Sequence, residues 1–422
     1  MKKKSLFSVL GTWVNRVMYP GREVDRLAEE KIISPGRQML KSFLHNRLAM
    51  SGLIIFLACL LLVTVGPQFS PLDLSYTDGT QQNVAPGYDM MKVPSEIVKN
   101  IAQIQPGPTF GFALTDSGEI ASWGKTGITS IIDLADVPED VQKADIALLA
   151  VGSNHAIAVD SSGKIYGWGS NRLGQLDFPR KIDEYQIKQL VAGNNYSALL
   201  DVDGTLVLWG NSNGTDLKVK KDYQGNIEQV ALADNCYVAL TKDGAAVYAG
   251  FNTSALLSNV PDGLESGVVQ VAATAYTAAA LKEDGTVVVW GNPARGENRI
   301  PEHDSKIIKL YGGRYHYVAE CEDGTYIAWG NNTHGQCDIP ADLAEGKAEA
   351  AVVSVGYYQN YVISTTGELY TWGLKGYLFG TDELGRDVLN RIINGGKVTM
   401  TVGAVSVIIS PVSYTHLTLP TT

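Results

Sequence analysis

VVQVAATAYTAAALKEDGTVVVWG, residues 268–291, is the stretch that decides the fold, because its pattern recurs along the chain. It contains three short apolar runs, and Asp284-Gly285 joins the last two. An Asp-Gly pair between strand-like runs is a strong hairpin signal, since glycine accepts a positive φ. Matching stretches occupy residues 187–210 and 307–330. Each copy therefore predicts a small antiparallel sheet that ends on Trp-Gly.

The Trp-Gly pairs give the period of the repeat. Their successive spacings are 45, 41, 81, 39 and 43 residues, and the long spacing holds a degenerate copy at Tyr248-Ala249-Gly250. Seven units of about 41 residues predict blades around an axis or a solenoid. The pairs begin at Trp123, Trp168, Trp209, Trp290, Trp329 and Trp372.

The residues after two of these pairs carry a family resemblance. GWGSNRLGQL (167–176) and AWGNNTHGQCDIP (328–340) fit the W-G-x-N-x-x-G-Q pattern of the regulator of chromosome condensation (RCC1) superfamily. The resemblance covers about residues 84–374 and implies an all-β, seven-bladed propeller. It is weakest in the fourth unit, which lacks Trp, and in the first, where Pro106-Gly107-Pro108 interrupts the turn.

The two ends of the repeat predict how the ring closes. Each Trp-Gly pair is followed by a polar stretch with Pro and an apolar run, but after Trp372-Gly373 this stretch is missing. Residues 84–104 resemble it, so we expect them to complete the last blade and leave no open edge. The chain would then enter and leave the propeller side by side, and such a domain can sit inside a loop of another domain at small cost.

A membrane helix is predicted before the propeller. Residues 48–66 read LAMSGLIIFLACLLLVTVG and carry no charge over 19 positions. At 1.5 Å per residue they span roughly 28 Å, about one hydrocarbon core. The alternative, a signal peptide, would need a leading region of nearly 50 residues and lacks a small-residue cleavage site.

Charge is distributed unevenly about this segment. Residues 1–47 contain ten Lys or Arg and four Asp or Glu, a balance of +6. The net charge of the whole chain is −10, so the remaining residues carry −16. The positive-inside rule places the N-terminus in the cytoplasm and the acidic remainder outside. The acidic balance argues against a nucleic-acid-binding protein.

Residues 377–410 depart from the repeat and carry a second resemblance. Gly380, Thr381, Asp382, Gly385, Arg386 and Asp387 form the G-T-D-x-x-G-R-D signature of the dipeptide/oligopeptide/nickel ABC-transporter permease family. Residues 34–62 look like that family's cytoplasmic lead and first helix. The resemblance implies a propeller inserted into an extracytoplasmic loop of a permease in a bacterial plasma membrane. It gives the signature a packing or gating role; the alternative for Arg386 and Asp387 is a solvated ion pair on an interfacial helix.

The local pattern around the signature predicts a short helix. Thr381 or Asp382 is a candidate N-cap, and Gly395-Gly396 a candidate stop. Leu384, Val388 and Ile392 would form its apolar face. Residues 398–410 begin a further uncharged run of 13 residues, too short to cross a membrane.

These segments give the expected domain organisation. The later permease helices and the E-A-A loop are absent, and residues 411–422 resemble a translated read-through tail, so we expect a truncated permease and leave that tail out of the fold prediction. The expected parts are a basic lead (1–47), a transmembrane helix (48–66), a linker (67–83), the propeller (84–374), the permease signature helix with the start of a second span (377–410), and the tail (411–422).

Little in the sequence points to catalysis. No nucleophile–base pair, phosphate loop or metal-ligand spacing occurs, so we expect no catalytic residue, cofactor or metal, and no enzyme activity. His155 and His316 share the repeat position of Asn195-Tyr196 and are interpreted as structural. Among the cysteines a Cys321–Cys337 disulfide stays open, and the others are Cys59 and Cys236.

The favoured hypothesis is a permease subunit of a peptide- or nickel-type ABC importer. The resemblance implies a second permease, ABC ATPases and a substrate-binding protein as partners. The propeller would bind a protein or ligand that the sequence does not identify, since loop-built faces suit interaction. The alternative is a membrane-anchored RCC1-repeat protein for surface interaction or adhesion, without a transport role.

Overall fold

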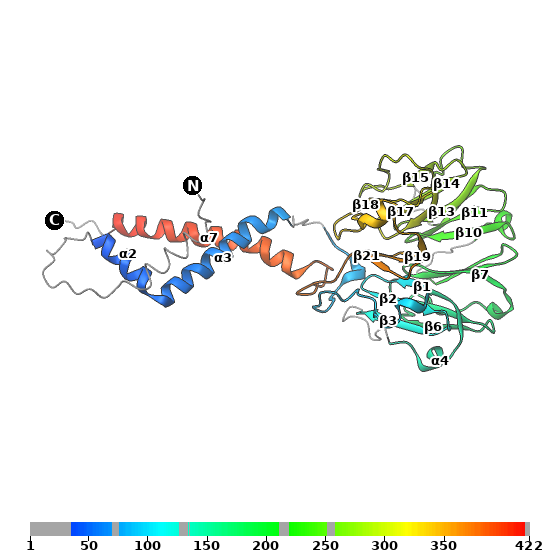
Figure 1. Ribbon diagram of the computed structural model, residues 1–422, viewed down its shortest axis with the longest axis horizontal. Helices are drawn as coiled ribbons and strands as arrows, with labels where there is room; N and C mark the ends of the chain where they lie inside the picture. Colours follow the sequence, from blue (N-terminus) through cyan, green and yellow to red (C-terminus); the bar gives the residue numbers. More distant parts are fainter. Residues whose placement is uncertain are drawn as a thin grey trace. The chain divides into compact units, whose positions relative to one another are not determined.

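The computed structural model describes residues 35–69, 76–125, 134, 136–210, 219–250 and 258–417. The chain forms two compact units (Figure 1). One unit runs from Tyr76 to Val388, and the other combines the segments on either side of it. We describe each unit by itself.

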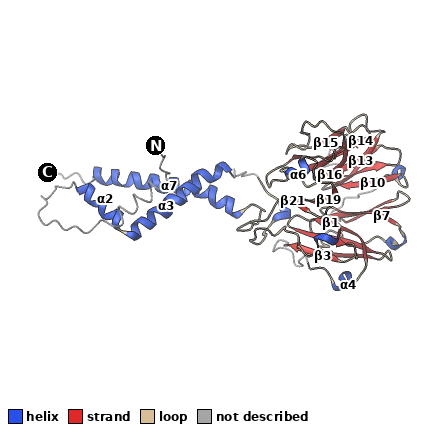
Figure 2. Cartoon of the chain, in the orientation of Figure 1, coloured by secondary structure: helices blue, strands red, loops and turns tan. Residues whose placement is uncertain are grey.

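The unit 76–388 is built from seven sheets, each of three consecutive antiparallel strands (Figure 2). We number these sheets as blades 1 to 7 along the chain. Blades 1 to 3 contain β1 (Ile101–Pro106), β2 (Phe110–Thr115), β3 (Ile120–Gly124), β4 (Ile146–Val151), β5 (His155–Asp160), β6 (Ile165–Gly169), β7 (Ile187–Ala192), β8 (Tyr196–Asp201) and β9 (Leu206–Gly210).

The later blades repeat the same order. They contain β10 (Ile227–Leu232), β11 (Cys236–Thr241), β12 (Ala246–Gly250), β13 (Val268–Ala273), β14 (Thr277–Lys282), β15 (Val287–Gly291), β16 (Ile307–Gly312), β17 (His316–Cys321), β18 (Tyr326–Gly330), β19 (Ala350–Val355), β20 (Gln359–Ser364) and β21 (Leu369–Gly373). Short helices lie in the connections: α4 (Glu139–Gln142), α6 (Ala341–Ala344), η1 (Gly79–Gln81), η2 (Val98–Asn100), η3 (Ile182–Glu184) and η4 (Lys221–Tyr223).

The blades form a closed ring. The first strand of each blade contacts the first strand of the next, and β19 of blade 7 contacts β1 of blade 1. The prediction of repeated β-sheets in a propeller is therefore confirmed. The degenerate fourth unit also forms a complete sheet, because its β11–β12 hairpin keeps the same register without a Trp.

In several blades the Trp of the repeat forms a hydrogen bond to the segment that follows the preceding blade. Trp209 Nε1 donates a 2.8 Å hydrogen bond to the backbone oxygen of Gln175. Gln175 lies in the polar stretch that follows the Trp-Gly pair of blade 2, and we call each such stretch the tail of its blade. Trp329 and Trp372 make the same contact with Glu297 and Gln336, at 2.7 and 2.8 Å. The W-G of one unit thus contacts the G-Q position of the preceding unit, which explains why the two motifs recur together.

Ring closure uses the N-terminal segment, as the sequence predicts. Trp123 of blade 1 has no preceding tail, and its Nε1 lies 3.4 Å from the hydroxyl of Tyr361 in blade 7. That hydroxyl donates to the backbone oxygen of Met91 at 3.0 Å. Val93 is buried in the same core between blades 7 and 1, with Ile97 packed against it. The segment therefore takes the place of the missing tail.

Glutamine side chains join several blades along the inner strands. Each inner strand is the edge of its sheet, so one side of its backbone lacks a ladder partner. Gln189 of β7 pairs with both the N–H and the C=O of Val230 on β10, at 3.0 and 2.9 Å. Gln270 of β13 pairs in the same way with Leu310 on β16. These amides act as substitute strand partners.

Two further glutamines make single bonds of this kind. Gln103 Nε2 donates to Leu149 O on β4 at 3.2 Å, and Gln229 Oε1 accepts from Val271 N on β13 at 3.0 Å. On β4, β16 and β19 the equivalent position holds Leu148, Lys309 and Val352. The glutamine contacts therefore do not extend round the whole ring.

The other unit contains helices α2 (Pro35–His45), α3 (Arg47–Phe69) and most of α7 (Val388–Leu417). Within the described residues, α3 is the helix long and apolar enough to cross a membrane. Two glycines lie where α3 and α7 meet. A Cβ on Gly66 would come within 2.7 Å of Ile393 Cγ2, and one on Gly396 within 2.7 Å of Val63 Cγ1. Small residues of this kind let helices approach closely.

The predicted short helix is wrong at both ends. The chain turns through Gly380 and Gly385, both with positive φ, so α7 begins only at Val388. Gly395-Gly396 does not end it either, because Gly396 makes room for Val63 within a continuous helix. Residues 411–417, which the sequence analysis left out, continue α7.

Candidate functional site

The permease-like signature lies in a paired structure that closes the propeller unit. Residues 76–91, where the chain enters this unit, run beside residues 374–388, where it leaves. We call these two segments the clasp. Five backbone hydrogen bonds join them: Gly87 N to Tyr377 O (2.8 Å), Thr381 N to Val84 O (3.0 Å), Asn83 N to Asp382 O (3.0 Å), Asp78 N to Leu384 O (2.9 Å) and Met91 N to Lys375 O (3.4 Å).

Thr381 and Asp382 hold this pairing with their side chains. The Thr381 hydroxyl accepts from Val84 N at 2.8 Å and donates to Gln81 O. The Asp382 carboxylate accepts from the backbone N–H of Leu384 and Arg386 and from Arg386 Nε, at 2.9 to 3.0 Å. Partial burial raises the pKa of Asp382, but these hydrogen bonds and the guanidinium outweigh it and hold the pKa below its ordinary value.

The signature glycines are needed where the two segments approach most closely. Gly380 has φ +72° and Gly385 φ +75°. A Cβ would lie 2.4 Å from Val84 O at Gly380 and 2.1 Å from Asp78 O at Gly385. Both the backbone conformation and the space therefore select glycine. Asp387 completes the turn through a backbone bridge to Thr381.

We expect Gly385→Ala to weaken the clasp more than a glycine substitution without a close neighbour. Gly367 is the matched control, because its φ is +83° and nothing lies within 4 Å of its added Cβ. Each alanine adds a left-handed conformation that costs about 1–2 kcal/mol. Only Gly385→Ala adds the clash with Asp78. Hydrogen exchange should show faster exchange of Val84 and Thr381 N–H in Gly385→Ala alone; equal protection in both variants would contradict the prediction.

An aromatic and polar cluster lies between the clasp and the propeller loops. Tyr358, which follows β19, donates its hydroxyl to the Asp78 carboxylate. His334 lies edge-on to the rings of Tyr358 and Tyr377, with centroids 5.5 and 6.0 Å away. Burial lowers the pKa of His334 to about 4. The sequence analysis missed this cluster, because its members come from parts of the chain 280 residues apart.

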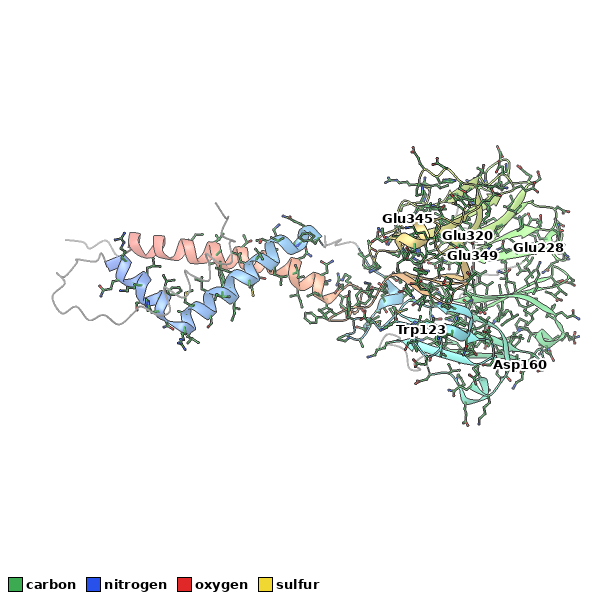
Figure 3. All side chains as sticks on the ribbon, in the orientation of Figure 1. Trp123, Asp160, Glu228, Glu320, Glu345 and Glu349 are labelled. Atoms are coloured by element: carbon green, nitrogen blue, oxygen red, sulfur yellow. The ribbon has the colours of Figure 1, made fainter. Side chains whose placement is uncertain are left out.

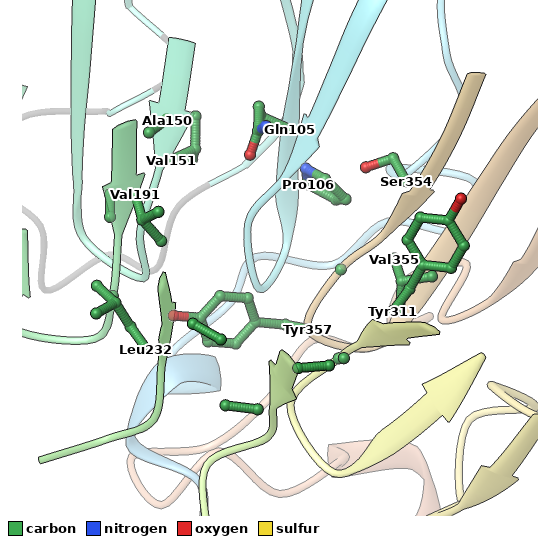
Figure 4. Close-up of a pocket in the computed structure, with 18 of the residues that line it drawn as sticks. Gln105, Pro106, Ala150, Val151, Val191, Leu232, Tyr311, Ser354, Val355 and Tyr357 are labelled. Carbon is green, nitrogen blue, oxygen red and sulfur yellow. The ribbon is translucent and has the colours of Figure 1, made fainter. Parts of the chain in front are cut away.

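The propeller encloses a central cavity of about 680 Å³, lined by its inner strands. The residues after these strands form one end of the cavity. Arg314, after β16, donates from both Nη atoms of its guanidinium to the carboxylate of Asp234, after β10; the Nη2–Oδ2 distance is 3.0 Å. Tyr357, after β19, projects into the cavity toward Leu232 (Figure 4). This end is nearest the clasp, because the neighbouring Tyr315 and Tyr358 pack against Val84 and Tyr377.

The Arg314–Asp234 pair is nearly out of contact with solvent. Its side chains are 9% and 12% exposed. Burial disfavours the charge on Arg314, yet the Asp234 carboxylate more than offsets this and keeps the pKa of the guanidinium above its ordinary value. Burial raises the pKa of Asp234, and Arg314 opposes that rise. Arg314 therefore stays charged, and its partner is required to neutralise it.

A repeat signal could have pointed to this end of the cavity. The second residue after each inner strand changes its chemistry from blade to blade, while the positions around it recur. Ser153, Asn194, Asp234, Ala275, Arg314 and Tyr357 occupy it in blades 2 to 7. A position that varies inside a regular repeat is a candidate for function rather than for packing.

The predicted structural histidines hold blade boundaries. His155 Nε2 lies 2.8 Å from Ser197 Oγ, which joins blades 2 and 3. His316 Nε2 lies 2.9 Å from Asn360 Oδ1, which joins blades 6 and 7. Both rings are fully buried, and burial lowers the pKa of each to about 4. Their interpretation as structural residues agrees with these contacts.

Other candidate chemistry stays dispersed. Cys321 and Cys337 do not pair, and all four cysteines are free. Within the described ranges, no group of three His, Cys, Asp or Glu is placed to hold a metal ion. Asp160, Glu228 and Glu345 lie at separate places on the propeller (Figure 3).

The family comparisons divide the chain along the same lines. Residues 34–86 match the N-terminal TM domain of oligopeptide transport permease C. Residues 146–175 and 268–297 match the RCC1 repeat. The chain therefore combines a permease-like membrane N-terminus with RCC1 repeats. The first match ends at residue 86, inside the clasp.

Individual relatives match only in part. The human E3 ubiquitin-protein ligase HERC2 is 33% identical over 100 residues, which cover 21% of this chain and 2% of that protein. The Ultraviolet-B receptor UVR8 of Arabidopsis thaliana is 37% identical over 83 residues, or 18% of this chain and 19% of that receptor. The chain thus spans a small fraction of these relatives.

Solved structures with a related shape include two propellers. The CRINKLY WD40 ectodomain of the Arabidopsis thaliana receptor kinase ACR4 has a TM-score of 0.49 and 15% identity, covering 67% of this chain and 98% of that one. Yeast RCC1 (Prp20), in its complex with Kap60, has a TM-score of 0.47 and 16% identity, covering 72% and 86%.

Proposed function

We propose that this chain is a permease-type membrane subunit of a peptide- or nickel-type ABC importer that carries an extracytoplasmic RCC1-like propeller. The clasp is the observation that carries the proposal. It pairs the end of the segment matching the permease domain with the G-T-D-x-x-G-R-D signature, although about 290 residues separate them. A propeller inserted into a permease loop requires such a pairing at its base.

The propeller supplies the interaction surface in this proposal. At the clasp end, Arg314, Asp234 and Tyr357 line its cavity. The opposite end and the loops around it are the surfaces that would receive a protein or ligand from outside the cell. A second permease, ABC ATPases and a substrate-binding protein are the partners that transport would require.

Cysteine labelling tests the orientation. In a background with Cys59 and Cys337 changed to Ser, we expect Val202→Cys in the propeller to react with a membrane-impermeant maleimide in intact cells. Val202 is 55% exposed. Lys41→Cys, in the basic lead, should react only after the membrane is opened, because basic flanks stay in the cytoplasm. Labelling in the reverse order would refute an extracytoplasmic propeller.

An uptake assay tests the transport role. Deleting the gene from the organism that carries it should reduce the uptake of a labelled dipeptide or of nickel. Restoring the full gene should recover it. If uptake by the deleted strain is unchanged for both solutes, a membrane-anchored surface interaction protein becomes the better description.

A further inference from the structure

The clasp presents apolar side chains to solvent at positions where turns are normally polar. Tyr377–Gly380 forms a turn closed by a 3.1 Å hydrogen bond from Gly380 N to Tyr377 O. Its two central residues are Leu378 and Phe379, which are 52% and 50% exposed. Turn centres favour Gly, Pro, Asn, Asp and Ser. Two large hydrophobic residues there serve no purpose in the turn itself.

The next turn repeats the feature. Gly385 N donates to Asp382 O at 2.9 Å, and the central Leu384 is 37% exposed. Tyr88 follows Gly87, which bridges to Tyr377, and is 62% exposed. We call Tyr88, Leu378, Phe379 and Leu384 the clasp rim.

The exposed apolar residues of the propeller unit are concentrated in this short region. Four of the eight large hydrophobic residues exposed in its described part belong to the clasp rim. The other four, Val202, Val269, Tyr276 and Ile308, are distributed over the blades. A cluster of exposed apolar residues beside a polar surface marks a site that contacts another protein or a membrane.

Chain connectivity favours the membrane as the surface that the clasp rim contacts. Helix α3 ends at Phe69, and only six residues precede the start of the clasp at Tyr76. Even fully extended, those residues reach about 20 Å. Helix α7 begins at Val388, directly after the signature. Connectivity therefore keeps the first residue of the clasp within this reach of the last residue of α3.

We infer that the clasp rim inserts into the interfacial layer of the lipid bilayer that α3 crosses. Aromatic and aliphatic side chains on a polar frame suit this layer, where one side of a residue contacts acyl chains and the other contacts water. The signature would then fix the height of the propeller above the membrane as well as close its base. This inference rests on the proposed membrane location of α3.

Fluorescence quenching in vesicles tests the inference. The full chain with Phe379→Trp is reconstituted in phosphatidylcholine carrying bromine at acyl carbons 6 and 7, and in the unbrominated lipid. The six propeller tryptophans that the structure describes are 3–7% exposed, so the unmodified chain gives the background. We expect the added Trp signal to fall about two-fold in brominated lipid, because interfacial Trp lies close to these carbons.

Two further variants make the result decisive. Val269→Trp is the matched control, because Val269 is 47% exposed but lies at the start of β13, at the other end of the inner strands from the clasp. Its signal should be unchanged by bromine. Phe56→Trp, at a position 51% exposed in α3, reports insertion of that helix.

The outcomes separate the two proposals. Quenching of Trp at 56 without quenching at 379 would overturn insertion of the clasp rim and leave the membrane helix in place. Absence of quenching at both positions would overturn the membrane location as well. Leu378→Trp reports the same surface should Phe379→Trp fail to fold, and the same results apply to it.

Discussion

Lowering the pH from 6.5 toward 4 should destabilise the propeller steeply. Burial lowers the pKa of His155, His316 and His334 from 6.5 to about 4 in the folded protein. The unfolded chain therefore binds more protons than the folded chain in this window, so stability is complete above pH 6.5 and falls as the pH decreases. Each histidine accounts for up to about 3 kcal/mol, and three together give a slope of about 4 kcal/mol per pH unit.

Urea unfolding of the full chain in detergent, followed by Trp fluorescence between pH 7.5 and 5, measures this slope. His316→Gln should reduce it by about one proton relative to the parent. His303→Gln is the control at an exposed position. Comparing these two variants cancels the contribution of the carboxylates. A parent slope below one proton would contradict the prediction.

Arg314→Met should cost about 3–5 kcal/mol of unfolding free energy, because it leaves the Asp234 carboxylate buried without its cation. The double variant Arg314→Met/Asp234→Leu should recover most of that loss, since removing both charges removes the penalty. Denaturant unfolding at pH 7.5 measures both.

An exposed ion pair gives the matched control. Lys143 and Glu139 are 71% and 81% exposed, so Lys143→Met should change the unfolding free energy by less than about 1 kcal/mol. If Arg314→Met were as mild as Lys143→Met, the pair would not be the buried, mutually dependent contact described above.

The parts of this fold that were predictable are those with local signals. The hairpins follow from Asp-Gly turns such as Asp284-Gly285, and the seven units follow from the Trp-Gly period. Closure by residues 84–104 was also predictable, because the final unit visibly lacks its tail. The membrane helix follows from an uncharged run as long as the hydrocarbon core is thick.

The clasp was not predictable from the same kind of signal. Leu384, Val388 and Ile392 have helical spacing, but Gly380 and Gly385 impose positive φ and close contacts with Val84 and Asp78. Partners nearly 300 residues away decided the local conformation. The glutamines at 103, 189, 229 and 270 recur visibly, but a single strand does not reveal which backbone edge each one pairs with.

Because the glutamine contacts do not extend round the whole ring, different side chains hold different blade boundaries together. Three boundaries have inner strands that lack the glutamine, and His155 and His316 bridge two of them, after blades 2 and 6. At the third, after blade 7, Ser354 Oγ donates to Ile104 O at 2.7 Å. His334, from the tail of blade 6, packs against Tyr358 of the blade 7 connection and Tyr377 of the clasp. All three histidines thus join one arc, blades 3 to 6, to the remainder of the molecule. Protonation of these histidines in mild acid would weaken the boundaries after blades 2 and 6. Opening of the ring would therefore begin at these two boundaries, while the glutamine-paired blades 3 to 6 stay together.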